Sequence, residues 1–445
     1  MSALVKLKEK LTSFQIIILG FAGVILLGSL MLMLPISTTA RVVTPFGKAC
    51  FTATSAVCVT GLVVFDTATY WSQFGQFIIL IMIQIGGLGV ITVASFLSMV
   101  VGKKIGLMQR QTMQDALSAP QVGGIVRLTK FIFLTSFAIE GIGAILLMPV
   151  FVPEYGVRGI WMSVFHSISA FCNAGFDLMG SSTGQFSSLT SFAGNPYVTI
   201  VITLLIIIGG IGFLSWKDVA TKKHHLKEYR MQTKVIFVTS AILIVVPAIF
   251  FFFVDFADKS MGERVCMSWF QSVTTRTAGF NTADFSQMSE PGKTIAMILM
   301  LIGGSPGSTA GGMKTTTIAI LFANAIAVFR KRQNANYFGR RVEDTIVKNA
   351  ATILMMYLIF AITAAIAIST IEGLPMQTSM FETFSAIGTV GLSFGITPGL
   401  SAASRVILII LMFFGRVGGL TMIFATILHK DKSTLKYPVE NITVG

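Results

Sequence analysis

The sequence predicts an all-α integral membrane protein, in which four tandem helix–pore loop–helix repeats surround one central pore with pseudo-fourfold symmetry and supply eight transmembrane helices. The prediction depends on composition, on a pattern that recurs four times and on the placement of basic residues. Of the 445 residues, 53% are hydrophobic and only 12% are charged. A soluble globule of this length could not bury so much apolar surface, so a membrane-embedded chain is expected.

The recurring pattern is a hydrophobic stretch, a short amphipathic segment that ends in a glycine, and a second hydrophobic stretch. The four glycines are Gly61, Gly175, Gly279 and Gly391, at spacings of 114, 104 and 112 residues. An aromatic residue stands ten positions before each of them, namely Phe51, Phe165, Trp269 and Phe381. A unit that recurs at one spacing defines the architecture. We expect the repeats to cover 1–101, 102–220, 221–340 and 341–445.

Each repeat is expected to contribute two spanning helices. The first helices are predicted at 14–35, 128–152, 235–256 and 347–371, and the second at 74–101, 197–216, 293–329 and 402–429. The first stretch follows three lysines, as a signal peptide would. No small-residue cleavage site follows it and it is long enough to span, so we interpret it as a retained helix.

The segments between the paired helices are predicted to turn back inside the membrane. Residues 46–59, for example, would make only about two-thirds of a span. Backbone that turns back at this depth is tolerated only where it is buried in protein or lines water. These four segments are therefore the first candidates for a functional site.

Basic residues predict the orientation. With both termini in the cytoplasm, 23 Lys and Arg residues fall in inner segments and 7 in outer segments, as expected because basic loops stay inside. The net charge of +14 is thus a topology signal and an attraction to the anionic lipid bilayer. No basic patch with interleaved aromatic residues suggests nucleic acid as a partner.

The short strings around the four glycines are the candidate ion-selectivity filter. Glycine aims successive carbonyls inward and keeps side chains out of a narrow lumen, and rings of carbonyls can replace the hydration shell of a monovalent cation such as K⁺. For a single glycine, a helix end or a close helix contact would explain the residue equally well. Four matching strings favour the filter: Val59, Thr60, Gly61; Asn173, Ala174, Gly175; Thr277, Ala278, Gly279; Thr389, Val390, Gly391.

A second candidate is a gate. A Gly-Gly pair recurs in each second helix, and helix packing explains the first two pairs. The third lies in a run too rich in glycine and serine to be a stable helix, so the span 293–329 must break there. The break would be a flexible flap across the path or a static kink. The gate residues are predicted as Gly303, Gly304, Ser305, Gly307, Ser308, Gly311, Gly312, Lys314 and Arg416.

Several charged residues lie in or near the predicted membrane segments. Arg416 lies within the last span, where a guanidinium is costly, so it should face the aqueous path or a partner and repel cations there. Asp66, Asp177 and Asp284 would concentrate cations at the outer mouth or would be solvated loop charges. Glu140, inside the third span, is expected to pair with an arginine or a loop amide and receives no role. The four cysteines have no metal-ligand spacing and are interpreted as packing residues.

The filter strings, the broken sixth span and the arginine of the eighth resemble the Trk/Ktr/HKT superfamily of cation transporters, and most of all the membrane subunits of bacterial Ktr potassium uptake systems. The resemblance covers essentially the whole chain. It implies K⁺ selectivity, because glycine rather than serine stands at Gly61, and a gate at the sixth-span break. It also implies a homodimer in the bacterial cytoplasmic membrane, bound to a cytoplasmic ring of nucleotide-binding KTN/RCK subunits that carry ATP or ADP.

Two other classes of function fit the sequence less well. A sodium-coupled secondary transporter of cations or another small solute also uses broken helices, but usually with inverted repeats and a midplane pocket. An enzyme would need a converging nucleophile and base or a metal cluster, which the membrane segments do not offer, and the chain has no phosphate-binding fingerprint or organic cofactor motif. The sequence leaves open whether sodium couples to transport and which ligand drives the gate.

Overall fold

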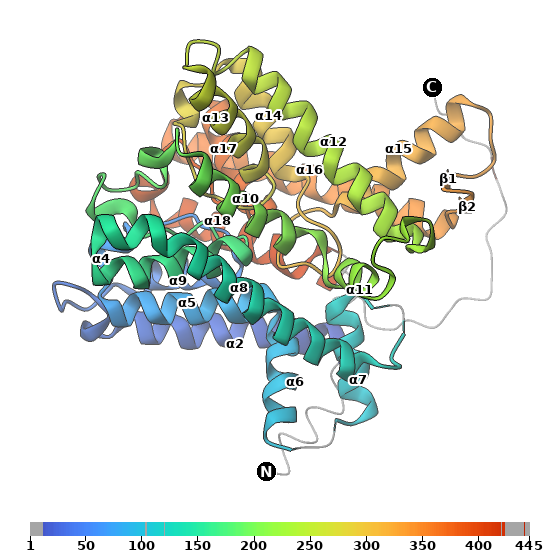
Figure 1. Ribbon diagram of the computed structural model, residues 1–445, viewed down its shortest axis with the longest axis horizontal. Coiled ribbons are helices and arrows are strands. Elements are labelled where there is room, and N and C mark those ends of the chain that lie inside the picture. Colours follow the sequence, from blue (N-terminus) through green and yellow to red (C-terminus); the bar gives the residue numbers. More distant parts are fainter. Residues whose placement is uncertain (1–11, 103–104, 120, 420, 423–439, 441–445) are drawn as a thin grey trace.

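The computed structural model describes residues 12–102, 105–119, 121–419, 421–422 and 440 (Figure 1). Within these residues the chain is helical, apart from a two-stranded antiparallel ribbon of β1 (Asn336–Tyr337) and β2 (Arg340–Arg341). The N-terminal lysines, the end of the predicted last span and the basic tail lie outside the described residues.

The first helix of each predicted repeat is long, apolar and continuous. These helices are α2 (Ser13–Met33), α8 (Ile125–Tyr155), α12 (Met231–Phe253) and α16 (Asp344–Glu372), and in the described residues only these four single helices are long and apolar enough to cross a membrane. Each is followed by one shorter helix that packs against it, α3 (Phe46–Val57), α9 (Val157–Phe171), α13 (Met261–Thr274) or α17 (Met376–Gly388). With 12 to 15 residues these helices are too short to cross a membrane, as expected of segments that turn back.

The second helices are shorter than predicted because each is interrupted. They are α5 (Gln73–Leu88), α10 (Pro196–Ile211), α14 (Glu290–Leu301) and α18 (Ala402–Val417), and the first three continue after a break as α6 (Val90–Val100), α11 (Phe213–Lys222) and α15 (Thr315–Phe329). The prediction of a break within 293–329 is confirmed. The spans predicted at 74–101 and 197–216 are bent, because α5 meets α6 at 98° and α10 meets α11 at 97°.

The bends have a common backbone cause. Gly89 (φ 87°, ψ 129°) separates α5 from α6, and Gly212 (φ 100°, ψ 140°) separates α10 from α11. Gly418 has nearly the same angles at the end of α18, φ 91° and ψ 138°. Only glycine adopts this region at low cost, so the helix ends there. The bend glycines thus stand at equivalent places in three of the repeats.

The predicted close packing of the glycine pairs is confirmed for the first two second helices. A Cβ added to Gly86 of α5 would collide with the carbonyl oxygen of Val57, and one added to Gly209 of α10 with that of Phe171. Each second helix therefore lies directly against the C-terminal end of the short helix of its own repeat, which a larger side chain would push away.

The remaining elements are short and connect these helices. They are α4 (Thr67–Tyr70), α7 (Leu107–Leu117) and the 3₁₀ turns η1 (Pro35–Ser37), η2 (Met179–Ser181), η3 (Thr190–Phe192), η4 (Leu226–Glu228), η5 (Phe285–Gln287) and η6 (Thr397–Gly399).

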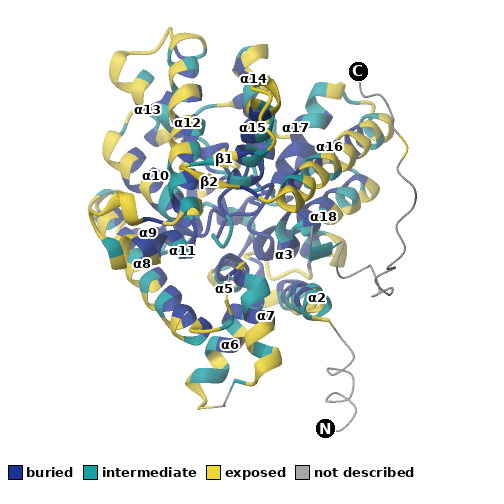
Figure 2. Cartoon of the chain, turned by 90° about the vertical axis from the view of Figure 1, so that its right-hand side faces the viewer, coloured by how far each residue is buried: buried dark blue, intermediate teal, exposed yellow. Residues whose placement is uncertain are grey.

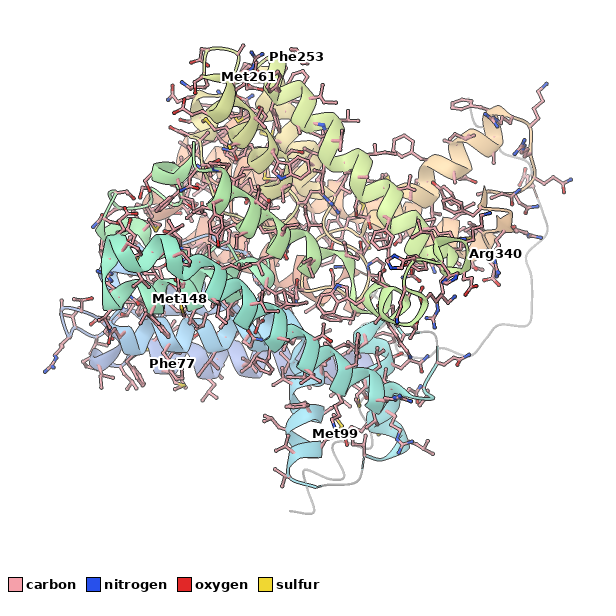
Figure 3. All side chains as sticks on the ribbon, viewed as in Figure 1. Phe77, Met99, Met148, Phe253, Met261 and Arg340 are labelled. Atoms are coloured by element: carbon pink, nitrogen blue, oxygen red, sulfur yellow. The ribbon has the colours of Figure 1, made fainter. Side chains whose placement is uncertain are left out.

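The middle of the molecule is buried, and its periphery is apolar and exposed. Figure 2 shows the buried residues in the middle of the molecule, around the short helices, and exposed residues along the outer helices. Large apolar side chains are exposed on those helices, such as Leu134 on α8 (72% exposed). Phe77 and Phe253 lie at the periphery in the same way (Figure 3). So extensive an apolar surface suits a lipid environment and not water.

Candidate functional site

The four glycine-bearing strings share one backbone conformation. Each glycine has a positive φ, of 94°, 68°, 78° and 93° in chain order, and so does the residue two positions earlier: Val59 (58°), Asn173 (58°), Thr277 (66°) and Thr389 (52°). Positive φ is uncommon for residues other than glycine, and for β-branched residues it is a true outlier. Because φ changes sign from one residue to the next, successive peptide groups point toward the same side of the chain. In a regular strand, successive peptide groups point to opposite sides.

The four strings are neighbours in a closed cycle. A Cβ built on Gly61 would lie less than 3.0 Å from the carbonyl oxygen of Ala174, in the next string. The same holds for Gly175 against Ala278, for Gly279 against Val390, and for Gly391 against Thr60, which returns to the first string. Backbone therefore meets backbone around one centre, and no residue with a side chain fits at the four glycines.

Hydroxyl groups at the ends of the short helices hold the strings. Ser55 accepts from the N–H of Gly61 (3.0 Å) and Ser385 from that of Gly391 (3.0 Å). In the other two strings Ser169 donates to the carbonyl of Phe176 (2.7 Å) and Thr274 to that of Phe280 (2.5 Å). Sequence reasoning missed these four residues. The signal was available, because each is a serine or threonine five or six positions before its glycine.

The four glycines line one side of a cavity of about 320 Å³. Asp66 and Asp177 line it too, whereas Asp284 does not and instead accepts from the N–H of Ser286 (2.8 Å) at the start of η5. Asp66 is engaged as well, since its Oδ1 accepts from the N–H groups of Ala68 (3.1 Å) and Thr69 (2.9 Å). Of the three carboxylates predicted at the mouth, Asp66 and Asp177 therefore line this cavity, and Asp284 only caps η5.

Asp177 follows the second string and lies outside the spanning helices. Burial raises the pKa of its carboxyl group to about 7, although the N–H of Met179 donates to it (2.9 Å) and opposes the shift. The neighbouring charge of Asp66 adds to the rise in pKa. The cavity is thus lined by a group whose charge changes near neutral pH.

On the other side of the strings, residues 302–314 cross the molecule as a buried loop between α14 and α15. Ser305 and Thr309 donate backbone N–H groups to the carbonyls of Gly210 (2.9 Å) and Gly209 (3.2 Å) at the end of α10. The Thr309 hydroxyl donates to the carbonyl of Phe171 (3.0 Å), where α9 ends. At the far end, Gly312 donates to the carbonyl of Gly415 in α18 (3.2 Å). The loop therefore joins the second repeat to the fourth beneath the cycle of glycines.

The loop also touches one of the strings. A Cβ added to Gly311 would collide with the hydroxyl oxygen of Thr389. That hydroxyl, like those of Thr60 and Thr277, is buried and has no hydrogen-bond partner in the part of the chain that the structure describes. Three of the strings thus carry hydroxyl groups that are not engaged by the protein.

Arg416 fastens the loop to the first repeat. Its Nη1 donates to the carbonyl of Thr309, and its Nη2 donates to the carbonyls of Gly86 and Gly87 (3.0 Å for Gly87) at the end of α5. Lys314 folds back on the loop itself, with Nζ donating to the carbonyls of Ala310 (2.9 Å) and Gly311 (3.2 Å). Both cations are half-buried and neither has an acidic partner among the described residues. Of the two expected surroundings of Arg416, the aqueous path or a partner, the structure shows partners, which are backbone carbonyls.

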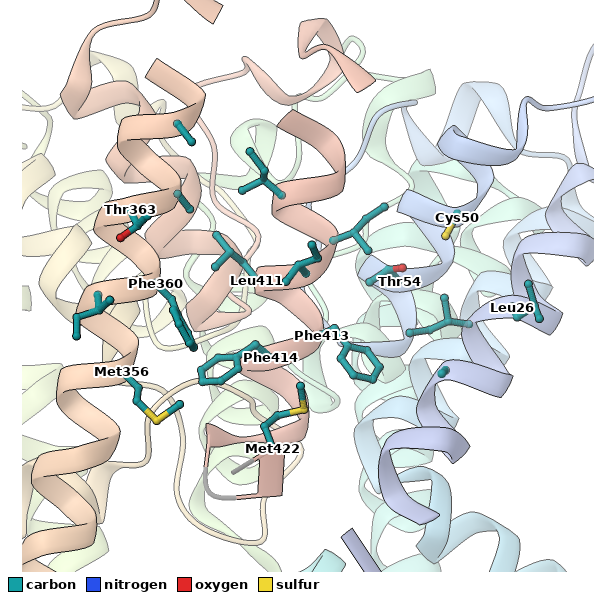
Figure 4. A pocket seen from close by; sticks show the side chains of 18 residues that line it. Leu26, Cys50, Thr54, Met356, Phe360, Thr363, Leu411, Phe413, Phe414 and Met422 are labelled. Atoms are coloured by element: carbon teal, nitrogen blue, oxygen red, sulfur yellow. The ribbon is translucent and has the colours of Figure 1, made fainter. Parts of the chain in front are cut away.

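A larger cavity, of about 1150 Å³, lies elsewhere. It is an apolar groove between α2, α3, α16 and α18, with Leu26, Phe360 and Phe413 on its walls (Figure 4). None of its lining residues is charged and none belongs to the four strings. A cation could not be stabilised there, so the groove is not the candidate site.

The predicted packing role of the cysteines agrees with the structure. Cys50, Cys58, Cys172 and Cys266 are all free, and all but Cys50 are buried. Within the described residues, no group of three or more histidine, cysteine, aspartate or glutamate side chains could hold a metal ion.

Comparison with known proteins decides the family. Residues 10–436 match the family model described as TrkH, cation transport protein. The chain belongs to the TrkH family. It is 38% identical to the potassium/sodium uptake protein NtpJ of Enterococcus hirae, over 99% of both chains. It is 39% identical to the Ktr system potassium uptake protein B of Bacillus subtilis, over 98% of this chain and 97% of that protein.

A solved member of the TrkH family has the same fold. The structure of the potassium transporter TrkH from Vibrio parahaemolyticus matches 93% of this chain and 84% of its own, with a TM-score of 0.73 at 17% identity. The resemblance to the Trk/Ktr/HKT superfamily is thereby confirmed, and so is the prediction of an all-α, multi-pass membrane protein. Its relatives are transporters of cations and not enzymes.

Proposed function

We propose that this TrkH-family protein takes up K⁺ across the bacterial cytoplasmic membrane through a selectivity filter made of the four glycine-bearing strings. The observation that carries the proposal is the closed cycle of Gly61, Gly175, Gly279 and Gly391, with positive φ at each glycine and two residues before it. Two relatives named as potassium uptake proteins support K⁺ as the ion.

In this proposal the four repeats, 1–101, 102–220, 221–340 and 341–445, are quasi-equivalent quarters of one pore with eight spans. Carbonyl oxygens of the strings replace the water around a dehydrating ion. The unengaged hydroxyls of Thr277 and Thr389 add ligands at the inner end of the filter. A preformed ring of oxygens avoids reorganisation when the ion enters, because the hydroxyl bonds from the short helices already hold the backbone.

The loop of residues 303–314 and Arg416 form the gate. The loop lies across the path in a closed position, because it bonds to α10, to α18 and, through Arg416, to α5. The guanidinium adds a positive charge beneath the filter, which raises the barrier for a cation until the loop moves. The many glycines of the loop allow that movement at low steric cost.

We propose further that a cytoplasmic nucleotide-binding ring of KTN/RCK type, which binds ATP or ADP, regulates uptake. The protein forms a homodimer in this proposal, and both termini of each chain lie in the cytoplasm. The printed name of the Bacillus subtilis relative, a protein of a Ktr system, supports a partner subunit. The surplus of basic residues in the loops assigned to the cytoplasm supports the orientation.

A second candidate is sodium-coupled transport. It is favoured by the relative NtpJ, which is named a potassium/sodium uptake protein. Coupling would show as K⁺ uptake that depends on a sodium gradient at constant membrane potential, whereas an uncoupled pore would follow the K⁺ gradient and the potential alone.

Replacement of Gly61 by serine tests the filter. The side chain would collide with the carbonyl of Ala174 and strain a backbone at φ 94°. We expect the ratio of Rb⁺ to Na⁺ uptake in proteoliposomes to fall about ten-fold. Gly184→Ser is the matched control, because Gly184 also has a positive φ (110°) but no atom within 4 Å of an added Cβ. An unchanged ratio in folded Gly61→Ser protein would contradict the filter.

A further inference from the structure

A buried acidic side chain lies behind the second string. Glu140, near the middle of α8, is 3% exposed, and the side-chain amide of Gln84 in α5 donates to both of its carboxyl oxygens (2.9 and 3.1 Å). No basic group pairs with it among the described residues. An acidic residue at this depth is costly to keep, and a functional role is the default hypothesis for it.

Gln84 and Glu140 reach the second string through one thiol. Cys172 directly precedes Asn173, and its Sγ lies 3.7 Å from Oε1 of Gln84 and 3.9 Å from Oε1 of Glu140. A thiol is a weak donor, and both of these oxygens are acceptors. The thiol packs closely against α5, because a Cβ added to Gly87 would lie only 2.6 Å from Sγ.

The backbone of Glu140 holds the same region. Its carbonyl oxygen accepts from the hydroxyl of Ser167 (2.7 Å), one turn before the end of α9. A Cβ added to Gly143 would collide with that hydroxyl, so α8 and α9 are in close contact at this level. Residues 140–143 therefore fix the end of α9 from behind, through both a side chain and the main chain.

The arrangement is particular to the second repeat. The position of Cys172, three residues before the glycine, is occupied by Cys58, Arg276 and Gly388 in the other repeats. Cys58 has no acidic partner among the described residues, and Arg276 donates to the hydroxyl of Ser240 (3.3 Å). Among the described residues at this position, only Cys172 lies against a carboxyl group; in the fourth repeat the buried Glu382 instead accepts from the hydroxyl of Ser393, two positions after Gly391.

We infer that Glu140 is a positioning residue for ion discrimination, which acts through Gln84 and Cys172 to hold the backbone of residues 173–175 in the ring of carbonyls. The inference rests on the proposed filter and adds to it a support outside the four strings. It depends on the acceptor oxygens of Glu140 and not on a net charge, so glutamine should substitute for the residue while alanine should not.

Four variants test the inference, each measured by Rb⁺ and Na⁺ uptake in proteoliposomes and by thermal unfolding. Glu140→Ala removes the acceptors, Glu140→Gln keeps one, and Gln84→Met removes the donor at nearly constant volume. Ser136→Ala is the control, because Ser136 is a fully buried residue one turn earlier on α8 whose hydroxyl has no partner. We expect the Rb⁺ to Na⁺ ratio to fall about three-fold or more in Glu140→Ala and in Gln84→Met.

Glu140→Gln and Ser136→Ala should keep the parental ratio, and Glu140→Ala combined with Gln84→Met should lower it no further than either alone, because the two residues act as one unit. If Glu140→Ala protein fails to fold, the Rb⁺ to Na⁺ ratio of Gln84→Met protein tests the inference. A parental ratio in the alanine and methionine variants, or a loss in Glu140→Gln equal to that in Glu140→Ala, overturns the inference. Gly61→Ser in the same assay separates the two claims: if it alone lowers the ratio, the filter stands without this support.

Discussion

At the scale of the residue, the four glycines are required for two independent reasons. Gly61, for example, has φ 94°, and a Cβ there would meet the backbone of the next string. The residues two positions earlier have no such freedom, and positive φ at Val59 or Thr389 costs on the order of 1–2 kcal/mol each. Hydrogen bonds such as those of Ser55 and Ser385 help offset that strain. Strain held at four equivalent points suggests that the conformation itself serves the function.

The charge of Asp177 should make uptake depend on external pH. Its pKa of about 7 lies above the usual value for aspartate, so the group is neutral at pH 6 and ionised at pH 8. Ionisation places a negative charge at the mouth, which raises the local concentration of cations. We expect K⁺ uptake at subsaturating concentration and low ionic strength to rise roughly two- to three-fold between these pH values.

Asp177→Asn should abolish that rise and keep the low value of pH 6 throughout. Asp284→Asn serves as the control, since Asp284 does not line the cavity and caps η5 instead. A pH dependence that survives in Asp177→Asn protein would assign the effect to another group.

At the scale of the element, the loop between α14 and α15 is held by its neighbours. Its backbone bonds to the ends of α10 and α18, and Arg416 supplies bonds to the loop and to α5 at once. A guanidinium suits this task because its planar fork presents several donors in fixed directions. In the proposed gate, the loop is a buried segment whose closed position depends on a few bonds, which is a property of two-state elements.

Arg416→Ala should open the gate. Loss of even one charge-assisted hydrogen bond costs about 1.5–3 kcal/mol, so we expect the open population, and with it ion flux, to increase about ten-fold or more. Deletion of residues 305–312 should also increase ion flux. Control of flux by the regulatory partner should weaken in both variants. Flux assays in proteoliposomes measure the effect.

Arg405→Ala is the matched control for Arg416→Ala, because Arg405 lies in the first turn of α18, far from the loop contacts. It should leave flux unchanged. Equal or lower flux from well-folded Arg416→Ala protein would show that Arg416 only packs the helices together.

The bends in the second helices were not predictable from the sequence. A glycine in an apolar run serves equally well for close packing, as Gly86 does, or for a bend, as Gly89 does, and the two are three residues apart. What decides between them is the neighbourhood: the N–H of Phe213, freed just after the bend at Gly212, donates to the carbonyl of Gly307 in the loop (2.7 Å). Such partners exist only after the repeats have docked.

At the scale of the whole molecule, repetition made the fold predictable. Four strings more than a hundred residues apart could be expected to meet because they match one another in sequence. The contacts between repeats could not be expected, since Gln84 and Glu140 are 56 positions apart and Arg416 and Gly86 are 330 apart. Periodicity indicates which segments are equivalent, but the pairing of individual polar side chains depends on how the packed helices face each other.

The central claim is that the four glycine-bearing strings surround a permeating ion. A density map of the protein in lipid nanodiscs with Rb⁺ or Tl⁺, whose electron-rich signals distinguish them from water, tests this most directly. The account predicts ion density at the centre of the cycle formed by Gly61, Gly175, Gly279 and Gly391, lost when Na⁺ replaces Rb⁺. Ion density confined to another part of the molecule, with the centre of the cycle empty, would contradict it.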